Sequence, residues 1–204
     1  MGQMMATEIT ENTPLNVFVT GVTTALGREV VRRLHAAGHK VVGATEGYEN
    51  AALVRADGGI PAYPDVMRAG ELRSIMQSSK TDVVINLAPQ ALNHLPHQPA
   101  AWDAALMNEG VAALLEASQE AGVKFVVHTS YAFAGEQSDD LHDLFEAVKA
   151  GERQVLNLHV PGCVLRFGFV YGAESPELVA TRDTLMRGRP VDSGPDNTHA
   201  GWIY

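Results

Sequence analysis

The chain is poor in cysteine, in aromatic residues and in positive charge. It has one cysteine among 204 residues, so no disulfide can form within the chain, which is typical of a reducing compartment. It carries 15 Lys and Arg against 24 Asp and Glu, and the net charge of −9 argues against a surface for nucleic acid or anionic membrane. No apolar run approaches the roughly 20 residues that cross a bilayer. We therefore expect a cytoplasmic protein with no nucleic-acid or membrane partner.

The hydrophobic content of 46% suits one sizeable core. Residues 1–14 are polar and lack the apolar centre of a signal peptide, so we expect a flexible leader there. Residues 15–204 are then predicted to form a single domain.

Strand-like and helix-like segments alternate from residue 16 almost to the end. Short apolar runs rich in β-branched residues predict buried strands at 16–20, 40–44, 82–88, 124–130 and 162–170, with a weaker edge strand at 60–63. Helical patterns fall between them, at 25–37, 50–57, 71–78, 101–121 and 143–158. This alternation predicts an α/β fold with a doubly wound parallel sheet and helices on both faces. Ligands of such sheets bind beyond the carboxyl ends of the strands.

The first strand is followed by GVTTALG, residues 21–27, and then by a helix. Gly21 would permit a tight turn and Gly27 close packing of helix on sheet, while the helix N-terminus would attract a pyrophosphate. The middle position, where a third glycine is expected, is Thr24. Thr23 and Thr24 could cap the helix or bond a phosphate. A plain strand-to-helix turn is the alternative interpretation.

Further motifs follow this loop in a fixed order. They are Asp65 in YPDVM, INLAPQ (85–90), Asn108 with Gly110, HTSYAFAGE (128–136), Lys149 with Glu152, and VLRFGFVYG (164–172). Together with the run from residue 17 to 45, they resemble the extended short-chain dehydrogenase/reductase family, the NAD-dependent epimerase/dehydratase group. The resemblance implies a Rossmann-like fold and NAD(P) binding. The cofactor contacts that it implies are Gly21, Thr23, Thr24, Ala25, Leu26, Gly27, Glu46, Asp65, Val66, Leu87, Ala88 and Lys149.

The choice of cofactor depends on the end of the second strand. Glu46 lies 19 residues beyond Gly27, where an acidic side chain would accept a hydrogen bond from a ribose 2′-hydroxyl and repel a 2′-phosphate. The nearest basic residue downstream is Arg55. We therefore expect NAD rather than NADP, with a solvated loop carboxylate as the alternative for Glu46. By the resemblance, Asp65 and Val66 would meet the adenine; a turn cap is the alternative for Asp65.

The catalytic set that the resemblance implies is incomplete. Members of the family use a Ser or Thr, a Tyr that carries the proton, and a Lys that lowers the pKa of the tyrosine. Ser130 and Lys149 occupy two of these positions, but Phe145 stands where the tyrosine should be and cannot carry a proton. Tyr131 should point to the opposite side of its strand. His142, one turn before Phe145, is a surrogate to consider, with an exposed loop histidine as the alternative.

Two functions therefore remain open. One is an oxidoreductase of the epimerase/dehydratase type with an altered proton relay and a small substrate such as a nucleotide sugar. The other is a non-catalytic subunit that binds a dinucleotide and has a structural or regulatory role. The resemblance also implies that the sequence, which ends at Tyr204, stops before most of the substrate-binding part, and that segments 101–121 and 143–158 form a homodimer interface.

The remaining reactive side chains have simpler interpretations. His94 and His97 are spaced like metal ligands, but Pro96 lies between them and no acidic or cysteine partner is near, so no metal is expected. Cys163 opens a predicted buried strand and is expected to fill the core.

Overall fold

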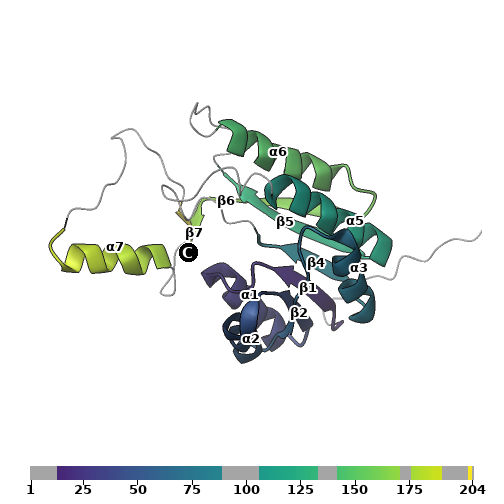
Figure 1. Ribbon diagram of the computed structural model, residues 1–204, viewed down its shortest axis with the longest axis horizontal. Coiled ribbons are helices and arrows are strands. Elements are labelled where there is room, and N and C mark those ends of the chain that lie inside the picture. The colour runs from purple at the N-terminus through teal and green to yellow at the C-terminus, as the bar shows by residue number, and fades with distance from the viewer. Residues whose placement is uncertain (1–12, 89–105, 133–141, 171–175, 190–201, 204) are drawn as a thin grey trace, which may run out of the picture.

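The structure is a computed structural model that describes residues 13–88, 106–132, 142–170, 176–189 and 202–203. Its centre is a parallel six-stranded sheet with the order β3-β2-β1-β4-β5-β6 (Figure 1). The strands are β1 (Asn16–Thr20), β2 (Lys40–Ala44), β3 (Ile60–Ala62), β4 (Val83–Asn86), β5 (Phe125–Tyr131) and β6 (Gly162–Phe167). The strand order reverses between β1 and β4, which confirms the predicted doubly wound α/β fold.

Helices connect successive strands of this sheet. They are α1 (Ala25–Ala36), α2 (Gly47–Ala56), α3 (Ala69–Ser78), the π-helix η2 (Leu106–Gly110), α5 (Val111–Ala121) and α6 (His142–Leu156). A further helix, α7 (Pro176–Met186), lies apart from the sheet in Figure 1. None of the helices formed by the described residues is long and apolar enough to cross a membrane.

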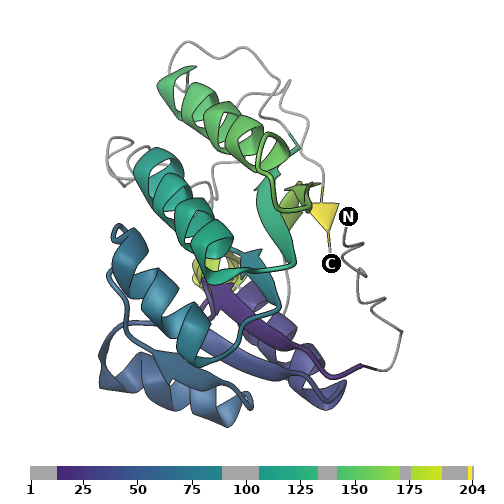
Figure 2. The ribbon, with the colours of Figure 1, turned by 90° about the vertical axis from the view of Figure 1, so that its right-hand side faces the viewer.

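Side chains that alternate along β1 divide the interior into two cores. Val17 and Val19 face one side, where they pack with Val31 of α1 and Val54 of α2. Phe18 faces the other side and belongs to the core that α3 and α5 cover. Figure 2 shows α5 and α6 side by side on one face of the sheet, as predicted for segments 101–121 and 143–158. The two layers of helices leave the carboxyl ends of the strands at one common edge.

Two predicted elements differ from those observed. The helix predicted at 101–121 is a π-helix over Leu106–Gly110 before α5 begins, while residues 101–105 lie outside the described part. Asn108 and Gly110, both weak α-helix formers, fall within this π-helix.

The strand predicted at 162–170 is in fact two strands. β6 ends at Phe167, and β7 (Phe169–Val170) pairs with β8 (Trp202–Ile203) in a separate two-stranded sheet. Gly168 separates the two strands, and a glycine weakens a strand and lets it change direction. Neither β8 nor α7 was predicted.

Candidate functional site

The loop between β1 and α1 requires glycine at both of its outer positions. Gly21 has a φ of +67°, and a Cβ there would lie 2.8 Å from the carbonyl carbon of Leu87. A Cβ on Gly27 would lie 2.0 Å from the carbonyl oxygen of Gly21. Both contacts are with backbone atoms, which cannot move aside as a side chain can. The loop is thus packed tightly against both α1 and the segment after β4.

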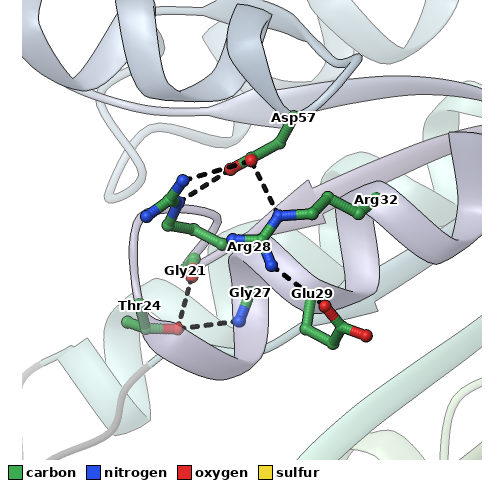
Figure 3. Close-up of polar contacts among 7 residues, drawn as sticks. All are labelled: Gly21, Thr24, Gly27, Arg28, Glu29, Arg32 and Asp57. Carbon is green, nitrogen blue, oxygen red and sulfur yellow. Dashed lines mark hydrogen bonds and ion pairs between the residues drawn. The ribbon is translucent and has the colours of Figure 1, made fainter. Parts of the chain in front are cut away.

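Thr24, at the middle position of the loop, is the N-cap residue of α1 (Figure 3). Its Oγ1 accepts a hydrogen bond from the N–H of Gly27 at 3.0 Å and donates one to the carbonyl oxygen of Gly21 at 2.8 Å. Its φ of −75° suits any residue, so this position does not require glycine. The capping role considered for Thr24 is therefore confirmed.

The remaining predicted loop residues surround this cap. Ala25 and Leu26 form the start of α1, where backbone N–H groups have no acceptor inside the helix. Leu26 also packs partly against the core beneath. Thr23 is half-buried beside the cap. The first turn of α1 thus keeps N–H donors for an anion.

Asp57, which the sequence reasoning missed, anchors α1 to the end of α2 (Figure 3). Its carboxylate accepts hydrogen bonds from Arg28 Nε at 2.8 Å and from Arg32 Nε at 2.9 Å. These two guanidinium groups lower the pKa of Asp57 although burial opposes them. Arg28 directly follows Gly27, so this ion pair engages a cation next in sequence to the loop. No local sequence signal marks the contact, because it joins two helices.

The last residue of β1 organises the segment that follows β4. Thr20 Oγ1 accepts hydrogen bonds from the N–H groups of Leu87 and Ala88, each at 3.2 Å. The same hydroxyl donates to Asn86 Oδ1 at 2.6 Å. Leu87 and Ala88, both predicted cofactor contacts, therefore lie beside the loop that contains Gly21.

A small cavity of about 60 Å³ opens at this edge of the sheet. The cavity is lined by two predicted cofactor contacts and by five residues that were not predicted as contacts. The lining residues are Thr20, Val66, Asn86, Ala88, Gly110, Val111 and Leu114. Of the predicted contacts, Val66 and Ala88 line this cavity. Asn86 and Gly110 lie inside motifs noted in the sequence, and the fold brings them together at the end of β4 and at the end of η2.

The two predicted acidic contacts have different surroundings. Glu46 precedes α2, is exposed, and makes no side-chain capping hydrogen bond. Asp65 is engaged in the turn before α3, where its Oδ1 accepts from the N–H of Met67 at 3.0 Å and its Oδ2 pairs with Arg68 at 3.1 Å. The turn-cap alternative for Asp65 is thus confirmed, and Asp65 is not in the cavity lining.

A polar row continues from the cavity across three strands. The registers place Thr20, Asn86 and His128 side by side on β1, β4 and β5. Asn86 Nδ2 lies 3.0 Å from Nδ1 of His128, which is 4% exposed. Because Asn86 Oδ1 accepts from Thr20, its amide group donates to His128, and Nδ1 is unprotonated. Burial lowers the pKa of His128 to about 4, although Glu152 opposes the shift.

Ser130 lies at the carboxyl end of β5, as predicted, but its hydroxyl is already engaged. It donates to Glu152 Oε1 of α6 at 2.5 Å, and both residues are buried. Glu152 also accepts from Arg166 of β6 through Nε at 2.8 Å and Nη2 at 2.6 Å. The hydrogen bonds from Arg166 are the main cause that lowers the pKa of Glu152, so the carboxylate is ionised. Ser130 therefore links β5 to α6.

Lys149 and Phe145 lie one turn apart on α6, as predicted. Lys149 Nζ pairs with Glu146 Oε1 at 3.0 Å, and its side chain is 34% exposed. Phe145 is 5% exposed. Val148, not Lys149, contributes to a second small cavity beside Tyr131 of β5. Within the described residues, no hydrogen bond joins Ser130 to Lys149.

The other candidates are weaker. His142 is exposed, as the simpler interpretation expected, but it is the first residue of α6 and not part of a loop. Cys163 is half-buried on β6, so the expectation that it fills the core is wrong. Within the described residues, no group of three His, Cys, Asp or Glu side chains could hold a metal ion. His94 and His97 lie outside the described residues.

Residues 17–182 match the NAD-dependent epimerase/dehydratase family. A curated relative, the 3-diazoavenalumate denitrifying reductase of a Streptomyces species, is 30% identical over 182 residues. That match covers 78% of this chain and 57% of the relative, so the chain spans a little over half of the relative's length.

Solved structures of known enzymes share the fold. UDP-glucose 4-epimerase from Thermotoga maritima, solved with UDP-glucose, has a TM-score of 0.75 at 22% identity, with 93% of this chain and 69% of that chain covered. UDP-glucuronic acid 4-epimerase from Bacillus cereus, solved with UDP-glucuronic acid and NAD, has a TM-score of 0.72 at 20% identity, with the same coverage.

Proposed function

Because the chain belongs to the NAD-dependent epimerase/dehydratase family, we propose that it binds NAD at the carboxyl edge of the six-stranded sheet. The observation that carries the proposal is the capped start of α1 beside the cavity lined by Thr20, Asn86 and Ala88. The carboxyl edge near a reversal of strand order is also where dinucleotides bind in this class of fold.

The pyrophosphate would lie at the first turn of α1. The N–H groups of Ala25 and Leu26 are donors there, and Thr24 already satisfies the N–H of Gly27. Gly21 and Gly27 carry no side chains that would keep a ligand from the backbone. Thr23 borders this turn and would complete the contact.

The adenosine half would lie toward β2 and the segment before α3. Glu46, exposed at the end of β2, would accept a hydrogen bond from the adenosine ribose and repel a 2′-phosphate, so NAD is favoured over NADP. By the resemblance, Asp65 and Val66 would meet the adenine. The cavity of about 60 Å³ can take only part of a cofactor, and the rest would lie along the open edge of the sheet.

The reaction that this site supports best is an oxidoreductase step of the epimerase/dehydratase type. Bound NAD would accept or return a hydride, while Ser130 and Lys149 would orient the substrate oxygen and the nicotinamide ribose. A nucleotide sugar is the proposed substrate class, since enzymes of the same fold have been solved with UDP-sugars. We also propose a homodimer through α5 and α6, and a cytoplasmic location from the single cysteine.

A second candidate function is a subunit that binds a dinucleotide without turnover. Phe145 cannot carry a proton, the hydroxyl of Ser130 is engaged by Glu152, and Lys149 is paired with Glu146. Each contact would have to change before these side chains could act on a substrate. These contacts favour a protein whose proton relay is altered or absent.

Titration of the chain with NAD⁺, NADH and NADPH tests binding, followed by the melting temperature, because a ligand that binds only the folded state stabilises it. We expect NAD⁺ to raise the melting temperature more than NADPH does, and Glu46→Gln to narrow that difference. If none of the three dinucleotides changes the melting temperature, the proposal is wrong.

Turnover is tested with UDP-glucose and NAD⁺ on the wild type and on Phe145→Tyr. Activity in the variant alone would mean that the wild type lacks the proton carrier and would support the second candidate. Activity in the wild type would support the first, and His142→Ala then tests the surrogate.

A further inference from the structure

The second small cavity, beside the carboxyl-terminal half of β5, is lined by a buried polar side chain that the fold uses only in part. The volume of the cavity is about 10 Å³, enough for one oxygen-sized group. His128 makes a hydrogen bond through Nδ1, but within the described part of the chain its other ring nitrogen, Nε2, makes none. The lining residues are Met107, Val111, His128, Thr129, Tyr131 and Val148.

Nε2 of His128 can be reached from this cavity. His128 is 4% exposed, yet Nε2 is not among the fully buried side-chain atoms of the described residues that lack a partner. The helix above it leaves room, because a Cβ on Gly151 of α6 would lie 3.6 Å from Nε2 and no side chain occupies that position. A small group in the cavity can therefore approach Nε2.

The polar row across the sheet determines what Nε2 can do. Asn86 donates to Nδ1 of His128, and the orientation of Asn86 is fixed by the hydroxyl of Thr20. Nδ1 is therefore the unprotonated nitrogen, and Nε2 carries the ring proton of the neutral imidazole. Burial keeps the ring neutral at pH 7, because it lowers the pKa of His128 to about 4. Nε2 is thus a neutral donor that needs an acceptor.

The surroundings of Nε2 favour a hydroxyl as that acceptor. The position of a Cβ on Gly151 is 3.3 Å from the carbonyl oxygen of Met107 as well as 3.6 Å from Nε2. A hydroxyl can accept from Nε2 and donate to a carbonyl oxygen at the same time, whereas a carboxylate or phosphate oxygen without a proton only accepts. The negative charge of Glu152, which acts on His128, also disfavours an anion at this place.

We propose that the second cavity binds a hydroxyl group of the substrate sugar and that His128 Nε2 donates a hydrogen bond to it. This inference rests on the proposed function and deepens it, because it assigns a substrate contact to a side chain for which the family resemblance implies no role. The row of Thr20, Asn86 and His128 would then connect the cofactor cavity, which Thr20 and Asn86 line, to the substrate.

Isothermal titration with UDP-glucose tests the contact in protein saturated with NADH, which cannot accept a hydride, so that no turnover occurs. His128→Asn keeps an acceptor for Asn86 near the position of Nδ1 but has no donor that reaches the position of Nε2. Its affinity for UDP-glucose should be about fivefold lower than that of the wild type, the value of one neutral hydrogen bond. Its affinity for UDP, which lacks the sugar, should be unchanged. Equal affinities of the two proteins for UDP-glucose, or an equal loss with UDP, would overturn the inference.

Thr81→Val is the matched control for a substitution at a buried polar residue. Thr81 Oγ1 lies 2.8 Å from Ser79 Oγ, and Thr81 precedes β4 at the opposite edge of the sheet. The control should have a lower melting temperature and an unchanged affinity for UDP-glucose. If Thr81→Val weakens UDP-glucose binding as much as His128→Asn does, the loss is not specific to the hydroxyl contact and the inference fails.

NMR of the wild type, labelled on its histidine nitrogens, gives a second test that needs no substitution in the core. In the presence of NADH, UDP-glucose should move the signal of the His128 Nε2 proton downfield, as a new hydrogen bond does, whereas UDP should not. An unmoved signal in protein that binds UDP-glucose would overturn the inference alone. If the wild type binds NADH but not UDP-glucose, the proposed substrate class fails together with the inference. If it binds neither, the proposed binding of NAD fails as well.

Discussion

His128 should make the stability of this protein depend on pH between neutrality and pH 4. Its folded-state pKa of about 4 lies below the ordinary value of 6.5, so the unfolded chain binds a proton before the folded chain does. The stabilisation is therefore fully present above pH 6.5 and is lost as the pH falls toward 4. The difference between the two pKa values lowers the free energy of unfolding by about 3 kcal/mol below pH 4 and by about 2 kcal/mol at pH 5, relative to its value above pH 6.5.

The polar row explains why the folded protein resists this proton. A proton on Nδ1 of His128 would face the amide donor of Asn86, and that amide cannot turn without losing the hydrogen bond that Thr20 donates to it. The Thr20 hydroxyl is in turn fixed by two backbone N–H groups. Among the described residues, the charge that favours protonation of His128 is Glu152, and Arg166 already compensates it.

Urea denaturation of the wild type and of His128→Gln at pH 7 and pH 5 measures the effect. A glutamine oxygen can accept the hydrogen bond from Asn86 but cannot titrate, so the variant should lose about 2 kcal/mol less than the wild type between these pH values. His142→Gln, which removes an exposed histidine, is the control and should lose as much as the wild type. Equal losses in His128→Gln and in the wild type would refute the reasoning.

Three further substitutions test the loop and its support, each by urea denaturation. Gly27→Ala should lower the free energy of unfolding by more than about 3 kcal/mol or prevent folding, because its Cβ would collide with the carbonyl oxygen of Gly21. Its control is Gly70→Ala, which has open space in the first turn of α3 and should leave the free energy of unfolding unchanged or raise it by up to about 1 kcal/mol. Equal effects of the two substitutions would contradict the packing argument. Thr24→Ala should lower the free energy of unfolding by about 1 kcal/mol, and Thr24→Gly by only a few tenths, because glycine is a tolerated N-cap residue. A Thr24→Gly variant as unstable as Thr24→Ala would argue against the capping role. Asp57→Ala should cost about 2 kcal/mol because it leaves two guanidinium groups without their buried partner, while Arg33→Ala, at an exposed pair, should change stability by less than about 0.5 kcal/mol.

The sequence predicts the first half of the fold well because its signals are local. A β-branched run, a glycine turn and an amphipathic helix identify β1, the loop and α1 without knowledge of their neighbours. The break at Gly168 was missed because the apolar pattern continues through it, and only the pairing of β7 with β8 shows that a new strand has begun.

The candidate site was predictable as a set of positions but not as a set of contacts. Ser130 and Glu152 were both noted in the sequence, yet the hydrogen bond between them depends on how α6 packs on β5. The contact of Asn86 with His128 depends on the register of β4 and β5.

Because Gly21 and Gly27 are closely packed, the glycine pattern alone does not distinguish a protein that binds a dinucleotide from one that has lost this binding. A descendant that gave up its cofactor would still need both glycines in order to fold, since their contacts are with the protein's own backbone. The glycine pattern would then persist in a protein that no longer binds a nucleotide. A group free to drift after such a loss is one that the fold does not use, such as the exposed carboxylate of Glu46, which makes no side-chain capping hydrogen bond.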